Sequence, residues 1–449
     1  MATDDTSSDV IVVGAGPGGY VAAIRSAQLG LRTAVVEREA VVGGRCLNHA
    51  CIPAKAVLRS ADVLSEVRGA GDFGITIGGA EPAVDFAKVV ERRTGVIRTL
   101  TGGVEGLLKK HGVTRIAGEA SLTPEGDVLV GGTAHVAAKA VVLATGSVRR
   151  PLPGLDFGGN VIGTEEAWAL TELPTTLAVI GAGASGTEIA SAYARLGTAV
   201  TLYEGLDRVL PAEDSDISKA VARGLKRQGI DVKTSTFFDP ADTDDFDHVV
   251  IAAGRGPDVA ALGLDAAGIA LTDHGLVAVD GALRTSKPKV YAIGDLVPGP
   301  ALAHKASDEG IIAVEDAAGH GTHPIAYGDI PRATFCTPNV GSFGLTEEQA
   351  RAAGHDVVVG TVQYGAVGAG TVYGDRTGLI KIVGDRTYGE LLGGHIVGAR
   401  ATELIQELAS LRLAEAGYPD VARMIHGHPT LSEGVMEAAR AADGWLIHG

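Results

Sequence analysis

Two runs of apolar residues are each followed by a glycine-rich turn, a helical pattern and a second apolar run. The first copy begins with DVIVV at residues 9–13, continues through YVAAIRSAQLG and ends in TAVVE. The second begins with LAVI at residues 177–180, continues through EIASAYARLG and ends in AVTLYE. Short buried strands that alternate with helices are typical of parallel sheets, so the pattern predicts two βαβ units in an α/β fold.

Each copy carries GxGxxG in its turn and a glutamate at the end of its second strand. These residues are Gly14, Gly16, Gly19 and Glu37 in the first copy, and Gly181, Gly183, Gly186 and Glu204 in the second. The glycines permit a tight turn, let the backbone approach a pyrophosphate and allow close helix packing, while the helix N-terminus attracts the anion. Because both copies share one register, we favour two dinucleotide sites over glycine turns without a ligand.

The glutamate of each copy indicates which nucleotide is bound. A carboxylate at this position accepts hydrogen bonds from an adenosine ribose and disfavours a 2′-phosphate. Glu204 therefore predicts a preference for NAD over NADP in the second copy.

A pair of cysteines, Cys46 and Cys51 in GGRCLNHACIPAK, follows the first copy. Residues five apart in a regular helix have Cα atoms about 8 to 9 Å apart, whereas a disulfide requires less than about 7 Å. Cys46 must therefore precede the helix or lie in a distorted first turn. Pro53 marks that turn, which places Cys51 near the helix N-terminus, where a thiolate is stabilised. Two buried free cysteines remain the alternative on spacing alone.

Together, the dithiol and the two nucleotide units predict an electron relay. A nicotinamide exchanges hydride, a dithiol exchanges two electrons, and a flavin is the usual intermediary. Because the dithiol adjoins the first unit, we expect FAD there and NAD in the second.

Composition narrows the class of protein. The 449 residues suffice for two to four domains, and the net charge of −16 argues against nucleic acid as a partner. We see no signal-peptide pattern and no apolar run of membrane-spanning length, and we expect a cytoplasmic protein without membrane contact or a metal site. In that compartment a Cys46–Cys51 bridge would be catalytic or regulatory, whereas Cys336 is interpreted as a core residue.

Further motifs resemble the pyridine nucleotide–disulfide oxidoreductases over nearly the whole chain. They are VVLATGS, VVIAAGRGP, VYAIGDLVPGPALAHKASDEG and HGHPTLSEGVMEAA. Within this family, the chain is most similar to the members that oxidise dihydrolipoamide. The resemblance implies two Rossmann-like domains, for FAD and NAD, followed by an α+β dimerisation domain.

The resemblance also implies roles for individual residues. Cys46 would be the outer thiol that exchanges with substrate, and Cys51 the inner thiol beside the flavin. Lys55 would lie near the flavin with Glu188 as its ion-pair partner, and Asp295 would bond the ribityl chain. The other implied FAD contacts are Gly118, Thr145, Gly146, Ala301, Leu302, Ala303 and His304. Glu188 and Gly254 are the remaining implied NAD contacts.

The segment from His428 to Glu433 has two interpretations. Locally, Thr430-x-x-Glu433 matches a capping box at a helix start. The resemblance implies instead that His428 takes and returns the substrate thiol proton and that Glu433 orients the imidazole. It further implies a homodimer in which the base of one subunit serves the dithiol of the other. His426 and His304 are interpreted as structural.

The motifs divide the chain into four parts. Residues 1–148 are expected to bind FAD and residues 149–278 to bind NAD. Residues 279–326 would return to complete the FAD domain, and residues 327–449 would form the interface domain.

The sequence departs from the family pattern in two places. Arg45, His49, Ala50 and Ala54 are atypical neighbours of the thiols. We hypothesise that Arg45 or His49 lowers a thiol pKa or alters the entrance through which substrate reaches the thiols. In addition, only FFDPADTDDFD separates two strands of the NAD unit where the family usually has several more, which predicts a shortened NAD domain.

The leading functional prediction is FAD-dependent oxidation of protein-bound dihydrolipoyl groups, with NAD as acceptor and a lipoyl-bearing acyltransferase of a 2-oxoacid dehydrogenase complex as partner. One alternative is another flavin disulfide reductase, acting on a low-molecular-weight disulfide or on mercuric ion. Glu204 weighs against NADP-linked reductases, and the absence of a C-terminal cysteine pair weighs against mercuric reduction. The other alternative is a low-turnover dimeric flavoprotein with a role in assembly or redox sensing.

Overall fold

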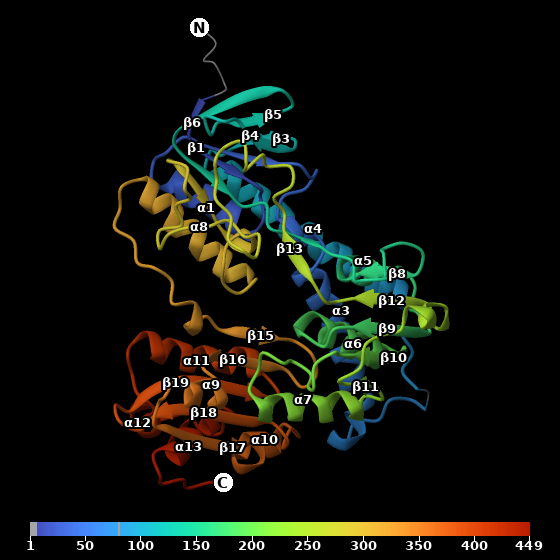
Figure 1. Ribbon diagram of the computed structural model, residues 1–449. Helices are drawn as coiled ribbons and strands as arrows, with labels where there is room; N and C mark the ends of the chain where they lie inside the picture. The colour runs from blue at the N-terminus through green and yellow to red at the C-terminus, as the bar shows by residue number, and fades with distance from the viewer. Residues whose placement is uncertain (1–6, 80) are drawn as a thin grey trace. The chain divides into compact units, whose positions relative to one another are not determined.

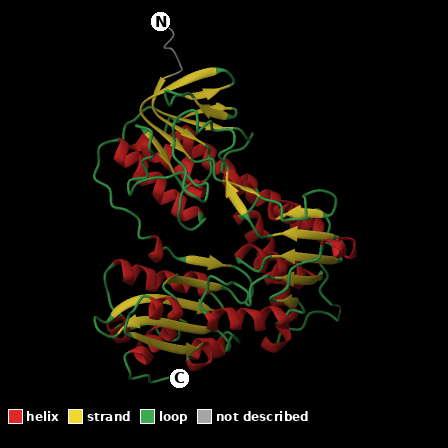
Figure 2. Cartoon of the chain, in the orientation of Figure 1, coloured by secondary structure: helices red, strands yellow, loops and turns green. Residues whose placement is uncertain are grey.

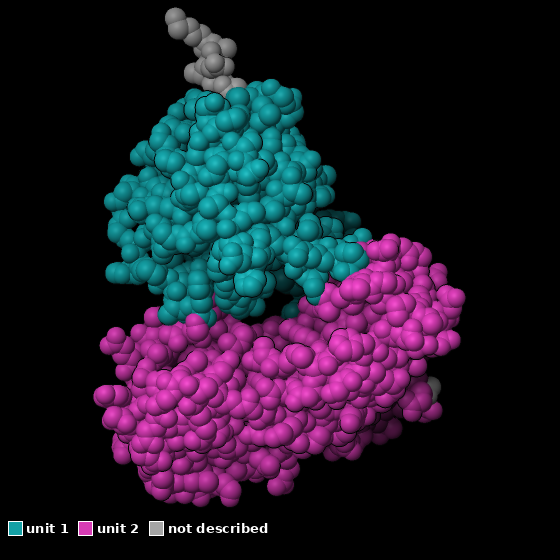
Figure 3. All heavy atoms as spheres, viewed as in Figure 1, with its two compact units in different colours: residues 1–56, 88–151, 254–327 teal, residues 57–87, 152–253, 328–449 magenta. Residues whose placement is uncertain are grey.

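The computed structural model describes residues 7–79 and 81–449. The chain divides into two compact units, coloured separately in Figure 3. Unit 1 comprises residues 1–56, 88–151 and 254–327. Unit 2 comprises residues 57–87, 152–253 and 328–449. Each unit therefore combines segments that are far apart in the sequence.

Unit 1 is built on one sheet with the strand order β3-β2-β1-β6-β5-β4, to which β14 adds by pairing with β6. The strands are β1 (Ser7–Val13), β2 (Thr33–Glu37), β3 (Thr114–Ala117), β4 (Ala120–Leu122), β5 (Val128–Val130), β6 (Thr133–Leu143) and β14 (Val290–Ala292). Strands β1, β2, β3 and β14 run parallel to their partners, whereas β4, β5 and β6 form antiparallel pairs at one edge. The register places Val12 between Val35 and Val142, all three fully buried.

Helices α1 (Pro17–Gln28) and α8 (Ala303–Ala317) lie side by side in unit 1, as Figure 1 shows. Glycine makes this close approach feasible, because a Cβ at Gly18 would lie 2.8 Å from the Ala306 carbonyl oxygen. A Cβ at Gly310 would likewise lie 2.6 Å from the Gly18 oxygen. The other elements are α2 (Gly44–Asn48), α4 (Phe86–Lys110), η3 (Gly294–Leu296) and the antiparallel pair β7 (Ser147–Arg149) and β13 (Arg255–Pro257). Helix α3 (Cys51–Arg68) begins in unit 1 and continues into unit 2.

Unit 2 contains a parallel sheet with the order β11-β10-β9-β12-β8. Its strands are β8 (Val161–Gly163), β9 (Thr176–Ile180), β10 (Ala199–Tyr203), β11 (Asp231–Lys233) and β12 (His248–Ile251). Its helices are α5 (Thr164–Ala169), α6 (Ala184–Leu196) and α7 (Ser215–Arg227). Between β11 and β12 the described residues form only the short turn η2 (Pro240–Asp245). The shortening of the NAD domain relative to the family stays a prediction.

A second sheet in unit 2 is antiparallel, with the order β15-β16-β19-β18-β17. Its strands are β15 (Arg332–Thr334), β16 (Val340–Gly344), β17 (Val357–Gln363), β18 (Leu379–Asp385) and β19 (Glu390–Val397). The accompanying helices are α9 (Glu347–Ala352), α10 (Gly368–Val372), α11 (Ala401–Leu413), α12 (Tyr418–Arg423) and α13 (Glu433–Ala442). The short turns are η1 (Ala70–Phe73), η4 (Tyr327–Asp329) and η5 (Tyr364–Ala366). Figure 2 shows this mixture of helices and strands, which confirms the predicted α/β and α+β parts.

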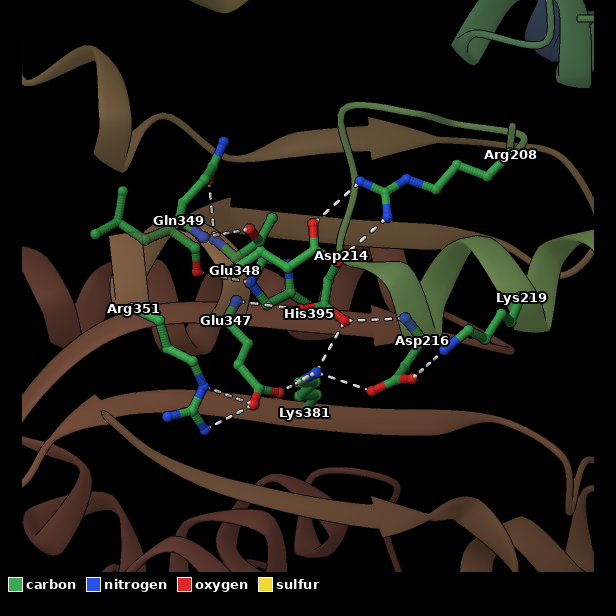
Figure 4. Close-up of polar contacts among 12 residues, drawn as sticks. Arg208, Asp214, Asp216, Lys219, Glu347, Glu348, Gln349, Arg351, Lys381 and His395 are labelled. Carbon is green, nitrogen blue, oxygen red and sulfur yellow. Dashed lines mark hydrogen bonds and ion pairs between the residues drawn. The ribbon is translucent and has the colours of Figure 1, made fainter. Parts of the chain in front are cut away.

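A buried lysine joins α7 to the antiparallel sheet inside unit 2. Lys381 on β18 lies 2.9 Å from Asp214, 2.8 Å from Asp216 and 2.8 Å from Glu347 (Figure 4). Only 2% of its side chain is exposed, and Asp214 also caps α7 by accepting the Asp216 N–H. Three carboxylates thus compensate one buried ammonium group, as burial of a charge requires.

The compact units differ from the expected domain borders. Residues 254–278, expected to end the NAD segment, cluster with unit 1, and Leu262, Leu264 and Val277 pack into the core around β1 and β6. Residues 57–87 cluster with unit 2. The four-part division itself stays a prediction. Cys336 is fully buried, as expected for a core residue. None of the helices within the described residues is long and apolar enough to cross a membrane.

Candidate active site

The first glycine turn has the geometry of an anion cradle. Gly14 has φ +102°, and a Cβ there would lie 2.5 Å from the Ala144 oxygen. A Cβ at Gly19 would lie 1.8 Å from the Gly14 oxygen, so only glycine fits. Gly16 caps α1 without any side-chain hydrogen bond, and Pro17 follows it. The first amides of α1 are therefore left for a ligand, and the helix dipole favours a phosphate there.

Glu37 is held in place beside this turn. Its Oε2 accepts a 2.8 Å hydrogen bond from the Ala15 N–H, and its Oε1 accepts a 2.9 Å bond from the Glu39 N–H. Gly118 donates its N–H to the Glu37 carbonyl at 3.0 Å. Each carboxylate oxygen retains a free lone pair that a ribose hydroxyl can use.

The second glycine turn repeats this arrangement in unit 2. A Cβ at Gly186 would lie 1.8 Å from the Gly181 oxygen. Glu204 accepts hydrogen bonds from the Ala182 N–H at 2.7 Å and the Leu206 N–H at 2.9 Å. Gly183 is the N-cap of α6 and supplies no side-chain cap. The duplicated sequence pattern therefore produces duplicated backbone geometry.

A cavity of about 390 Å³ in unit 1, here called the nucleotide cavity, opens beside the first turn. The predicted site residues that line it are Gly14, Gly16, Glu37, Cys46, Cys51, Gly118, Thr145, Gly146, Asp295, Ala301, Leu302 and Ala303. Gly19, Lys55 and His304 belong to the same unit but do not line it. Glycine cradle, ribose carboxylate and dithiol thus share one cavity, which fits FAD with its flavin end toward the thiols.

The two thiols sit on either side of a break between helices. Cys46 lies within α2 and Cys51 is the first residue of α3, with the chain turning at His49 and Ala50. This confirms that one regular helix does not carry both cysteines. Both cysteines are half-buried thiols. A hydrogen bond with Cys51, burial and the charge of Cys51 raise the pKa of the Cys46 thiol, while the charges of Lys55 and Arg45 act in the opposite direction.

A buried ion pair positions the backbone next to Asp295. Lys305 and Glu309 on α8 lie 3.1 Å apart with no exposed side-chain surface. Lys305 Nζ donates to the Gly294 carbonyl at 2.7 Å, and Glu309 Oε2 accepts the Gly294 N–H at 2.7 Å. Both backbone groups of Gly294 are thereby fixed, and so is the direction in which Asp295 leaves the chain.

Sequence reasoning missed several polar contacts at or beside the nucleotide cavity. The Ser147 hydroxyl donates to Asp295 Oδ2, and Arg255 Nε donates to the same hydroxyl at 3.0 Å. Arg38 pairs with Asp258 at 2.8 Å, and Asp258 also lines the nucleotide cavity. These pairs join residues more than 100 positions apart, so no local pattern indicates them.

In unit 2, His428 and Glu433 are in contact as predicted. His428 Nδ1 lies 2.8 Å from Glu433 Oε1, and the imidazole is 77% exposed. Partial burial would raise the pKa of Glu433, but the Thr430 N–H and His428 outweigh it and lower that pKa. With Nδ1 held by the carboxylate, Nε2 is the nitrogen that can exchange a proton.

The predicted capping box is only half formed. Glu433 Oε2 accepts the Thr430 N–H at 2.9 Å, but Thr430 Oγ1 donates to the Gly427 carbonyl. The N-cap of α13 is Ser432, so the cap prediction for Thr430 is wrong. His426 pairs with Glu407 and is structural, as expected.

Glu188 and Gly254 are the remaining predicted site residues. Glu188 is 5% exposed, and its Oε1 accepts the Phe335 N–H at 2.9 Å. Gly254, expected to contact NAD, belongs to unit 1 and has φ +85°. The pairing of Lys55 with Glu188 stays a prediction.

Comparison with known proteins agrees with this geometry. The sequence profile of the family described as pyridine nucleotide-disulphide oxidoreductase matches residues 8–310, and the profile of its dimerisation domain matches residues 330–439. The chain is 39% identical to the dihydrolipoyl dehydrogenase of Bacillus subtilis, with 99% of both chains covered. It is 41% identical to that of Halobacterium salinarum, with 99% of this chain and 98% of the relative covered.

Comparison with solved structures indicates the same class of protein. LpdA from Mycobacterium tuberculosis superposes with a TM-score of 0.87 at 26% identity, covering 97% of this chain and 99% of that one. The HOCl-induced flavoprotein disulfide reductase RclA from Escherichia coli superposes with a TM-score of 0.83 at 27% identity, covering 95% of this chain and 98% of that one.

The chain therefore belongs to the pyridine nucleotide-disulphide oxidoreductases. It is an NAD-dependent flavoprotein oxidoreductase, with FAD and NAD(H) as its cofactors. Its dimerisation domain supports assembly as a homodimer.

Proposed function

We propose that this enzyme oxidises dihydrolipoyl groups carried on an acyltransferase partner and passes the electrons to NAD. The observation that carries this proposal is the convergence of Cys46 and Cys51 on the nucleotide cavity, in a chain about 40% identical to dihydrolipoyl dehydrogenases over its full length. The ribose carboxylate Glu204 supports NAD as the acceptor.

The chemistry begins with the dithiol in its disulfide form. A substrate thiolate attacks the Cys46 sulfur, forms a mixed disulfide and releases Cys51 as a thiolate. The second thiolate of the substrate then attacks the substrate sulfur that is bonded to Cys46. This step closes the oxidised substrate ring and releases Cys46 as a thiolate. Two electrons have then moved from substrate to protein. When FAD is bound, its chemistry is two-electron transfer between such a dithiol and a nicotinamide.

Proton transfer falls to His428 in this proposal. The attacking substrate thiol must lose its proton, and an exposed imidazole whose Nδ1 is held by Glu433 can accept it at Nε2. We propose that this base serves the dithiol of the second subunit in the homodimer, so that a monomer lacks a complete site.

Steady-state oxidation of dihydrolipoamide by NAD tests the proposal. We expect NADH formation by the holoenzyme and none by a Cys46→Ala variant that retains FAD. Turnover by Cys46→Ala would contradict the mechanism, and absence of turnover by the native enzyme would contradict the substrate.

A second candidate is reduction of another disulfide substrate. The close structural match to a flavoprotein disulfide reductase induced by HOCl and the atypical residues Arg45 and His49, which line the nucleotide cavity, favour it. NADH oxidation with low-molecular-weight disulfides, compared with lipoamide under the same conditions, separates the two candidates.

A further inference from the structure

The loop that carries His428 connects two short helices of unit 2. It begins after Arg423, the last residue of α12, and ends at Glu433, the first residue of α13. The two helices pack against each other. His428 itself is 77% exposed, so few contacts of its own side chain hold it. Its position therefore depends on how α12 and α13 are joined.

Two arginines join the last turn of α12 to α13 and the residue that follows it. Arg440 of α13 donates from Nε to the Ala422 carbonyl at 3.1 Å. Arg423 donates from Nη1 to Asp443 Oδ2 at 2.8 Å. Most of the Arg423 side chain is exposed, and an exposed ion pair by itself contributes little. This pair therefore strengthens the junction only if another group orders the arginines.

Trp445 contacts both of these arginines. Its ring centre lies 4.9 Å from the guanidinium carbon of Arg440 and 5.7 Å from that of Arg423. Both distances fall within the range of about 6 Å over which a cation is attracted to an indole face. Trp445 Nε1 also donates at 2.6 Å to Asp443 Oδ2, the oxygen that accepts Arg423. One indole thus orders the groups that join the two helices.

The segment after α13 (residues 443–449, here called the tail) is tied back to α13 by a buried carboxylate. Glu437 Oε2 accepts the Ile447 and His448 N–H groups at 3.1 Å each, and its Oε1 accepts Arg440 Nη1 at 2.7 Å. Only 1% of the Glu437 side chain is exposed. Trp445 is therefore fixed from both directions, by Asp443 before it and by the bonds to Glu437 after it.

We propose that Trp445 is a positioning residue for the base His428. This inference rests on the role of His428 in the proposed function. Stacking of the indole on Arg423 and Arg440 holds the last turn of α12 against α13. The loop then starts and ends at fixed points, and it presents Nε2 of His428 at one place. The role concerns proton transfer from the substrate thiol and not the reaction of the nicotinamide.

Steady-state oxidation of dihydrolipoamide by NAD in Trp445→Leu tests this role. Leucine keeps an apolar side chain in the tail but has no aromatic face for the arginines. We expect kcat to fall about tenfold, less than the roughly 100-fold loss that misplacement by about 1 Å can cause. Trp445→Phe keeps an aromatic ring and should restore most of this loss. Ile447→Ala removes a side chain of the tail that is 62% exposed, keeps the N–H to Glu437 and should retain native kcat.

Two further measurements separate positioning of the base from a general loss of structure. Reduction of the bound flavin by NADH needs no substrate thiol and should proceed equally in the native enzyme and in Trp445→Leu. The loss of kcat should also shrink above about pH 8.5, where thiols ionise without the help of a base. A loss of kcat that is the same at every pH, or slower reduction of the flavin, would overturn the positioning role.

His428→Gln separates failure of this role from failure of the proposed function. Native kcat in Trp445→Leu, together with a loss of kcat in His428→Gln, would overturn the role of Trp445 and keep the base. Native kcat in His428→Gln would refute the base itself and the role of Trp445 with it.

Discussion

The Glu309 carboxylate accepts a 2.7 Å hydrogen bond from the Gly294 N–H, and this contact connects a buried ion pair to the residue before Asp295. Glu309 is 0% exposed, and Tyr327 donates to its second oxygen at 2.6 Å. Lys305, Tyr327 and the Gly294 N–H compensate this buried carboxylate for the hydration that it loses.

Removing the ammonium group of Lys305 should weaken the binding of FAD. In Lys305→Met, Glu309 remains buried without its counter-ion, which costs about 3 to 5 kcal/mol for a buried pair. We expect FAD to dissociate at least about tenfold faster, followed by the rise in flavin fluorescence on release. Arg284→Gln, which breaks an exposed pair with Asp316 on the same helix α8, is the control and should retain FAD normally. Equal release rates in both variants would contradict a role for Lys305 in holding Gly294.

Arg45 should promote ionisation of the outer thiol. Its positive charge acts to lower the pKa of Cys46 against the larger effects of Cys51 and burial. In the reduced enzyme, Arg45→Thr should therefore raise that pKa further and slow alkylation of Cys46 near pH 8 about two- to threefold. The pH dependence of iodoacetamide labelling measures this. A labelling profile identical to that of the native enzyme would show that Arg45 does not lower the thiol pKa. The same assay on His49→Val tests whether His49 does.

Loss of the imidazole at position 428 should slow turnover without unfolding the protein. His428 is 77% exposed, so His428→Gln costs little packing, while loss of a general base lowers kcat about 100- to 10,000-fold. Glu433→Gln should have a smaller effect, because the amide still accepts one hydrogen bond. His426→Gln is the matched control, since that histidine pairs with Glu407 and should affect stability more than kcat. Equal losses of kcat in His426→Gln and His428→Gln would argue that neither is the base.

The Lys381 cluster should make unit 2 sensitive to acid. Hydrogen bonds with Lys381 lower the pKa values of Asp216 and Glu347, and they outweigh burial to lower that of Asp214. Because the folded-state values lie below the ordinary 3.8 of aspartate and 4.5 of glutamate, this stabilisation is complete above about pH 4.5 and is lost as the pH falls through the folded values.

Urea denaturation of the native protein and of Lys381→Met tests this sensitivity. At pH 7 we expect the variant to be less stable by about 3 to 5 kcal/mol, since it leaves Asp214 buried without its cation. The difference between the two proteins should shrink as the pH falls below 4. A difference that does not change with pH would show that packing of the lysine side chain, not its charge, stabilises unit 2.

Local patterns predicted the parts of the site that lie within one segment. The glycine turns, the terminal glutamates and the break between Cys46 and Cys51 follow from spacing and backbone sterics, and the structure has all three. Contacts between distant segments were not predictable, because no periodicity relates Ser147 to Asp295 or Asp214 to Lys381.

The domain border shows a different limit of sequence reasoning. The motifs placed residues 254–278 in the NAD segment, but Leu262 and Leu264 pack into the core of unit 1. Apolar residues in a loop-rich segment indicate burial without indicating against which sheet. The border near residue 327, where a short turn leads into a new sheet, was easier to place.

The order of the segments in unit 1 constrains how the enzyme can be made. The nucleotide cavity is lined by residues from Val13 to Ala306, although the first glycine turn is complete by residue 19. A ribosome emits the chain from its N-terminus, so the cavity walls supplied by α8 appear only after all of the parallel sheet of unit 2 has been synthesised. Tight capture of FAD must therefore wait until about two thirds of the polypeptide has emerged, and the early glycine turn must remain empty or protected until then.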